Sequence, residues 1–132
     1  MADIDLHIQF LPPDPAGGVP AFRPGETVQG SIQITPAADV NCRHLFVRLR
    51  WQTEGRGDQD RGVGAEEDLY QGQLRGGVPF YQRFHFTAPN EPWSYSGHYV
   101  SIVWQVEVTV DLPLARDAQA AEKFILAPDS RR

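Results

Sequence analysis

The sequence contains a single cysteine, Cys42, among its 132 residues. An intramolecular disulfide is therefore impossible, whereas a secreted domain of this size often uses several. No apolar run approaches the roughly 20 residues that cross a bilayer. The first residues, Met-Ala-Asp-Ile-Asp-Leu-His, are acidic and lack the basic and apolar regions of a signal peptide. These absences predict a cytoplasmic protein without a transmembrane segment.

Positive charge is also scarce, since 12 Lys and Arg residues stand against 17 Asp and Glu residues and give a net charge of −5. This balance argues against nonspecific binding of DNA or RNA. Residues 54–68 are especially acidic and contain Gly57, Gly62 and Gly64. We expect a mobile, acidic hairpin loop there rather than a calcium site, because Arg61 adds positive charge and the acidic spacing does not complete an EF-hand.

Motifs for catalysis and metal binding are missing too. There is no Gly-x-Ser-x-Gly, no Cys-x-x-Cys and no histidine pair at i, i+4 spacing, so neither a serine hydrolase nor a zinc site is indicated. Cys42 lies two residues from His44, which leaves a cysteine nucleophile as a distant alternative to a structural thiol. The sequence predicts a protein that is not an enzyme and holds no metal or cofactor.

What the sequence has in quantity is turn formers, with 12 Gly and 11 Pro residues. This composition favours short strands joined by turns over a helical bundle. The length fits one domain, residues 1–132, with residues 128–132 as a C-terminal tail.

The clearest strand is residues 99–111, where apolar side chains occupy every even position from Val100 to Val110. Alternation of this length in β-branched and aromatic residues predicts a long strand with one buried face. Shorter alternations predict strands at 4–10, 28–34, 45–51 and 80–87, with weaker candidates at 69–74 and 124–126. The Ala-rich stretch 115–123 has room for two helical turns. Together these segments predict an all-β fold, an antiparallel immunoglobulin-like β-sandwich of about seven strands.

Two segments resemble the arrestin family. One is Phe22-Arg-Pro-Gly-Glu-Thr-Val-Gln-Gly-Ser-Ile32, a Pro-Gly turn leading into a strand that contains Gly30. The other is Pro89-Asn-Glu-Pro-Trp-Ser-Tyr-Ser-Gly97, which introduces the long strand ending at Val110-Asp111. The resemblance implies one sandwich of the N-terminal arrestin type, related to sporulation-control and retromer arrestin-like proteins, which have two in tandem. Physically, Gly25 suits a turn of positive φ, and Gly30 indicates a bulge or a close contact.

Two rows of outward side chains are the candidate partner-binding residues. His44, Phe46, Arg48 and Arg50 share one face of their strand, as do Tyr81, Arg83 and His85. If the two strands are neighbours, these residues form a basic and aromatic patch of the kind favoured at protein interfaces. The alternative is that they are cross-strand partners of acidic residues such as Glu107.

The resemblance and the absence of catalytic motifs together predict a non-enzymatic adaptor that binds a protein or peptide through a sheet face, a sheet edge or loops. An exposed sheet edge also makes a homodimer possible. The alternative is a sandwich that binds a small molecule or carbohydrate, with Trp93 and Tyr95 stacking on a ring.

Overall fold

The computed structural model describes residues 3–13, 16–57 and 59–128. Eleven strands form within these ranges, and the described residues contain no helix. In chain order the strands are β1 (Ile4–Phe10), β2 (Ala21–Phe22), β3 (Thr27–Pro36), β4 (Val40–Cys42), β5 (His44–Gly55), β6 (Arg61–Asp68), β7 (Gly72–Leu74), β8 (Phe80–Thr87), β9 (Tyr95–Ser96), β10 (Val100–Asp111) and β11 (Ala118–Leu126). Consequently, these ranges hold no helix long and apolar enough to span a membrane.

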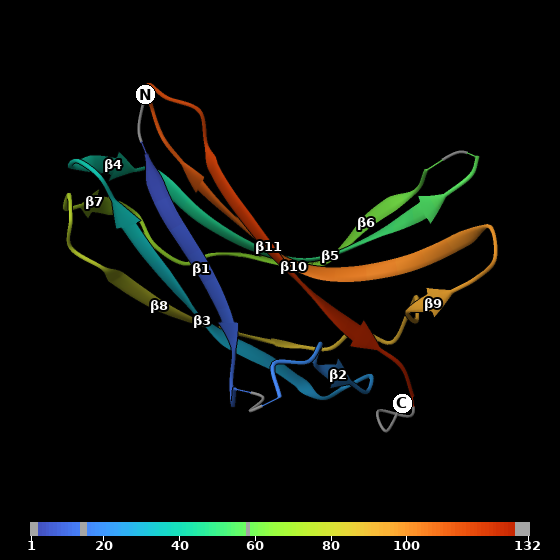
Figure 1. The fold of residues 1–132 in the computed structure, drawn as a ribbon. Coiled ribbons are helices and arrows are strands. Elements are labelled where there is room, and N and C mark those ends of the chain that lie inside the picture. Colours follow the sequence, from blue (N-terminus) through green and yellow to red (C-terminus); the bar gives the residue numbers. More distant parts are fainter. Residues whose placement is uncertain (1–2, 14–15, 58, 129–132) are drawn as a thin grey trace.

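The strands form two packed layers (Figure 1). One sheet has the order β1-β3-β8, and the other has the order β2-β11-β10-β5-β6, with β9 paired to the start of β10. A two-stranded ribbon, β4-β7, lies at one end. All pairings are antiparallel except the short parallel one between β2 and β11. The all-β antiparallel sandwich predicted from the sequence is confirmed. It has eleven strands in the described residues rather than about seven, and the four that were not predicted are β2, β4, β6 and β9.

One hydrophobic core lies between the two sheets. In β10 the even-numbered residues from Trp104 to Val110 are fully buried, as the alternation predicts, while Val100 at the start of the strand is 36% exposed. They pack with the inner row of β5 and with inward residues of the facing sheet. The fully buried members from these strands are Leu45, Val47, Leu49, Val28, Ile32 and Ile34. Burial of each such side chain stabilises the fold by about 1.5–3 kcal/mol.

Residues 54–68 do not form one loop, so this prediction is wrong for most of the segment. β5 extends to Gly55, and Arg61–Asp68 forms β6, an edge strand paired with β5. Glycines permit this pairing, because a Cβ at Gly62 would clash with the Trp51 indole and one at Gly64 would lie 2.9 Å from the Trp104 ring. Asp58 and the tail residues 129–132 lie outside the described residues.

The Ala-rich stretch is also extended rather than helical. β11 begins at Ala118 and pairs antiparallel with β10, from Val110 opposite Ala118 to Trp104 opposite Phe124. An isolated helix of two turns is marginal, whereas the edge of β10 offers this segment a full set of backbone partners. The alternate positions Ala118 and Ala120 face the interior with Phe124 and Leu126.

Both glycines of the first arrestin-like segment have the expected roles. Gly25 has a φ of +88°, which a turn of this kind requires. Gly30 is a close-contact position, because a Cβ there would clash with the carbonyl oxygen of Gln9 and the ring of Phe84.

Candidate interaction surfaces

The outward residues of β5 share one face, as the sequence predicts. His44, Phe46, Arg48 and Arg50, here called the β5 row, lie half-buried on the outer face of the larger sheet. Tyr81, Arg83 and His85, the β8 row, are exposed on β8. However, β8 belongs to the other sheet. The two rows lie on different layers, so the predicted single patch does not exist.

The arginines of the β5 row are engaged with neighbouring carboxylates. Nη1 of Arg50 donates to both carboxylate oxygens of Glu107, at 2.9 and 2.8 Å. Arg48 pairs with Glu66 and also reaches Glu107, with Nη1 3.6 Å from Oε1, while its guanidinium lies 4.9 Å from the ring centre of Phe46. This is the cross-strand arrangement that the alternative interpretation expects. Each such pair near the surface contributes about 0–1 kcal/mol.

Two further polar side-chain pairs lie where β5 begins. Nδ1 of His44 is 2.6 Å from Oδ2 of Asp68, and Nη2 of Arg43 donates to Oδ1 of Asp111 at 2.8 Å. Burial acts to raise the pKa of Asp68, but hydrogen bonds from His44, Gln71 and the Leu45 amide outweigh it and hold that pKa below the usual 3.8. The hydrogen bond from Arg43 likewise lowers the pKa of Asp111.

Cys42 lies in the core rather than in a cleft. Burial, followed by the nearby charges of Asp68 and Asp111, raises the pKa of its thiol to about 11. The thiol is therefore protonated at neutral pH and unsuited to act as a nucleophile. In the parts of the chain that the structure describes, no cluster of three or more His, Cys, Asp or Glu side chains could hold a metal ion.

Trp93 and Tyr95 are both exposed, at 52% and 60%. The indole N–H of Trp93 donates to the carbonyl oxygen of Asn90 at 2.8 Å. Tyr95 lines an open groove of about 510 Å³ together with Val103 and Ile125, and Trp93 is not part of that lining. The two aromatic residues therefore do not line one stacking site.

The smaller sheet has an open edge at β1. Within the described residues β1 pairs with β3 alone. The Leu11 amide donates to Gln29 at 3.0 Å and the Ala37 amide to Asp3 at 2.8 Å, so the odd-numbered residues of β1 carry the hydrogen bonds to β3. In an antiparallel pair the alternate residues point the other way. Ile4 and Leu6 thus direct their backbone N–H and C=O groups toward the open edge.

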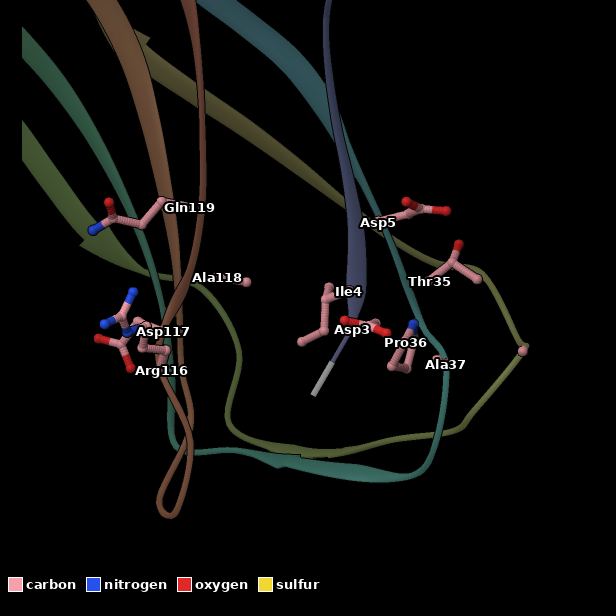
Figure 2. Close-up of a pocket in the computed structure, with 11 residues that line it drawn as sticks. Asp3, Ile4, Asp5, Thr35, Pro36, Ala37, Arg116, Asp117, Ala118 and Gln119 are labelled. Atoms are coloured by element: carbon pink, nitrogen blue, oxygen red, sulfur yellow. The ribbon is translucent and has the colours of Figure 1, made fainter. Parts of the chain in front are cut away.

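A cleft of about 920 Å³ lies beside this edge, between the start of β1 and the start of β11 (Figure 2). We call it the edge cleft. Its residues are Asp3, Ile4, Asp5, Thr35, Pro36, Ala37, Gly77, Arg116, Asp117, Ala118 and Gln119. The figure shows the β1 and β3 residues on one side and residues 116–119 on the other. Small residues such as Ala37, Gly77 and Ala118 leave this end of the sandwich unfilled.

At the other end of β1, aromatic rings fill the space between β1 and β11. Phe10, at the end of β1, lies 6.3 Å from Phe124 of β11 and 6.1 Å from Phe22 of β2, measured between ring centres. Phe22 and Phe124 meet edge to face at 5.8 Å. The edge cleft is therefore confined to the part of β1 near Ile4, where the facing side chains are small.

The architecture is similar to that of a known protein. The crystal structure of Spo0M, a sporulation control protein from Bacillus subtilis, superposes with a TM-score of 0.71 at 16% sequence identity, over 95% of this chain and 49% of the Spo0M chain. This chain has an arrestin-like fold. The arrestin-like sandwich spans about half the length of Spo0M. No family model matches the sequence, and no curated protein does.

The edge cleft of the arrestin-like sandwich was not anticipated from the sequence. A signal for it exists in β11, where the inward row begins with Ala118 and Ala120 and ends with Phe124 and Leu126. Small side chains followed by large ones predict a layer that is open at one end and closed at the other. That signal depends on recognising 118–126 as a strand.

Proposed function

We propose that this chain is a non-enzymatic protein-interaction module that receives an extended segment of another protein at the open edge of β1. The observation that carries the proposal is that this edge opens directly onto the edge cleft. Addition of a strand to an exposed sheet edge is a common mode of peptide recognition, in which the main chain supplies affinity and alternate side chains supply specificity.

Strand addition uses the two features of this site together. An incoming strand forms hydrogen bonds with the outward backbone groups of Ile4 and Leu6, each worth about 0.5–1.5 kcal/mol. Every second side chain of the incoming segment enters the edge cleft beside Ile4, where apolar surface is buried. Because the contact is short, we expect a dissociation constant on the order of 0.1–1 mM for a peptide alone.

The outer sheet face is the less favoured route for a partner. In the β5 row the arginines already have carboxylate partners, so a new partner would have to replace existing ion pairs. The β8 row stays a second candidate face, since Tyr81 is 64% exposed. Self-association through the β1 edge of a second copy is a further expectation, which light scattering over a wide concentration range tests.

Spo0M is, by its name, a sporulation control protein, and a control function suits an adaptor. We extend this to the present chain as part of the proposal, together with a cytoplasmic location. The charge balance and the lack of nucleic-acid-binding features favour a protein partner.

Binding of defined peptides, followed by NMR, tests the proposal. Three end-blocked hexapeptides alternate valine with serine, lysine or glutamate, and each is titrated to about 2 mM, above the expected dissociation constant. We expect at least one peptide to shift the amide signals of residues 3–7 and 116–119. A matched peptide with N-methyl groups on alternate residues should bind at least about tenfold more weakly, because it cannot complete the ladder.

Two results would overturn strand addition. One is the absence of shifts with all three peptides. The other is shifts that are confined to the β5 row or the β8 row and are insensitive to N-methylation.

A further inference from the structure

We propose that the segment received at the β1 edge is cationic, with basic side chains alternating with apolar ones. This inference rests on the proposed function and names the class of partner. It comes from the charges around the edge cleft and from the faces on which they lie.

The edge cleft is acidic. The residues that border it include three aspartates, Asp3, Asp5 and Asp117, against one arginine, Arg116. All four residues are exposed. No ion pair found among the described residues includes any of them. Asp117 is held in place, since its Oδ1 accepts a hydrogen bond from the Leu112 amide at 3.2 Å.

The charges of the β5 row contrast with this arrangement. There, Arg48 pairs with Glu66 and Glu107, and Arg50 pairs with Glu107, so each arginine has a carboxylate partner. The carboxylates of Asp3 and Asp5 thus remain available to an incoming group, whereas those of Glu66 and Glu107 do not.

Because side chains alternate along β1, the carboxylates of Asp3 and Asp5 lie on one face of the strand. They meet only those residues of the incoming segment that point to the same face. Ile4 faces inward, whereas Asp3 and Asp5 belong to the opposite, outward row. An added strand sets its own outward side chains directly across from that row, at about 4.5–5.5 Å between Cβ atoms. Opposite charges at such positions attract and like charges repel. Basic residues at alternate positions thus complement the site, and apolar residues between them enter the cleft.

The three hexapeptides provide the test. At low ionic strength we expect the valine–lysine peptide to bind at least about tenfold more tightly than the valine–glutamate peptide, with the valine–serine peptide between them. In about 0.5 M salt the difference should shrink to about twofold, because exposed charges are screened.

Paired variants separate a local effect from the net negative charge of the whole protein. The double variant Asp3→Asn, Asp5→Asn should reduce the lysine-to-glutamate affinity ratio at least about threefold. Glu67→Gln, Glu91→Gln makes the same change in net charge at two exposed positions outside the edge cleft, and it should keep most of the preference. Circular dichroism checks that both double variants are folded.

Each outcome decides between the two proposals. Binding of all three peptides at the β1 edge with equal affinity would overturn the cationic preference and leave strand addition standing. An equal loss of the preference for lysine over glutamate in the two double variants would also overturn the cationic preference. The absence of binding by any peptide would overturn strand addition itself.

Discussion

The indole Nε1–H of Trp104 donates a hydrogen bond to the carbonyl oxygen of Pro92 at 2.6 Å. Trp104 is fully buried in the middle of β10, and Pro92 lies in the connection that follows β8. This bond joins the connection between the two sheets to the core residue beneath it. It explains physically why a tryptophan, rather than another large apolar residue, suits this position.

Replacing Trp104 should therefore destabilise the protein by more than the lost side-chain volume accounts for. We expect Trp104→Phe to lower the free energy of unfolding by about 2–4 kcal/mol, because it leaves a cavity and an unpaired carbonyl. Trp93→Phe is the matched control, since it also removes an indole-to-carbonyl hydrogen bond but at an exposed site. It should change stability by less than about 1 kcal/mol. Urea denaturation measures the free energy of unfolding of both variants. Equal losses in the two variants would contradict the role assigned to the buried hydrogen bond between Trp104 and Pro92.

Gly64 in β6 should be nearly as sensitive to substitution. A Cβ at this position lies 2.9 Å from the Trp104 ring, so Gly64→Ala requires either the buried ring or the β6 backbone to shift. We expect a loss of about 1–3 kcal/mol. Val63→Ala, in the same strand but 54% exposed, should change stability by about 0.5 kcal/mol or less. A neutral Gly64→Ala in thermal or urea unfolding would place residues 61–68 in a loop after all.

The Arg43–Asp111 pair predicts a specific dependence on pH. Since the pKa of Asp111 is lowered from 3.8 in the folded protein, its contribution to stability is present above pH 3.8 and is lost as the pH falls through the folded value. The destabilisation caused by Asp111→Asn should therefore shrink between pH 6 and about pH 2. Urea unfolding across this range provides the measurement. Arg43→Gln should add little further loss in the Asp111→Asn background; full additivity would contradict the pairing.

The thiol of Cys42 should be inert while the protein is folded. Its pKa of about 11, raised from 9.0, lowers the thiolate fraction about 100-fold, and burial blocks access in addition. We expect an aromatic disulfide reagent at pH 8 to label the folded protein at least about 100-fold more slowly than the protein in guanidinium. Fast labelling without unfolding would restore the nucleophile hypothesis.

Much of the fold could be predicted from the sequence, because alternation reports directly which face of a strand is buried. The even row of β10 from Trp104 to Val110 and the inner residues Leu45, Val47 and Leu49 of β5 are buried as predicted. Alternation does not report which strands are neighbours, and β5 and β8, which would have to be neighbours to form one patch, lie in different sheets. Neighbours depend on topology and on long-range pairing.

Other misses have local causes. The composition of Arg61–Asp68 resembles a loop, since Gly62 and Gly64 weaken strand propensity, but those glycines accommodate Trp51 and Trp104. The alanines of β11 favour a helix intrinsically, and the edge of β10 overrides that preference. The edge cleft lies between β1 and β11, so it can be predicted only once residues 118–126 are recognised as a strand.

Amide hydrogen exchange at β1 tests the central claim most directly. In the free protein, the His7 amide, which points to β3, should exchange slowly, and the Leu6 amide, which points to the open edge, should exchange quickly. Saturation with the valine–lysine peptide should slow exchange at Leu6 at least about tenfold while exchange at His7 changes little. An unchanged Leu6 amide in the saturated complex, or a Leu6 amide already as protected as His7 in the free protein, would contradict the account.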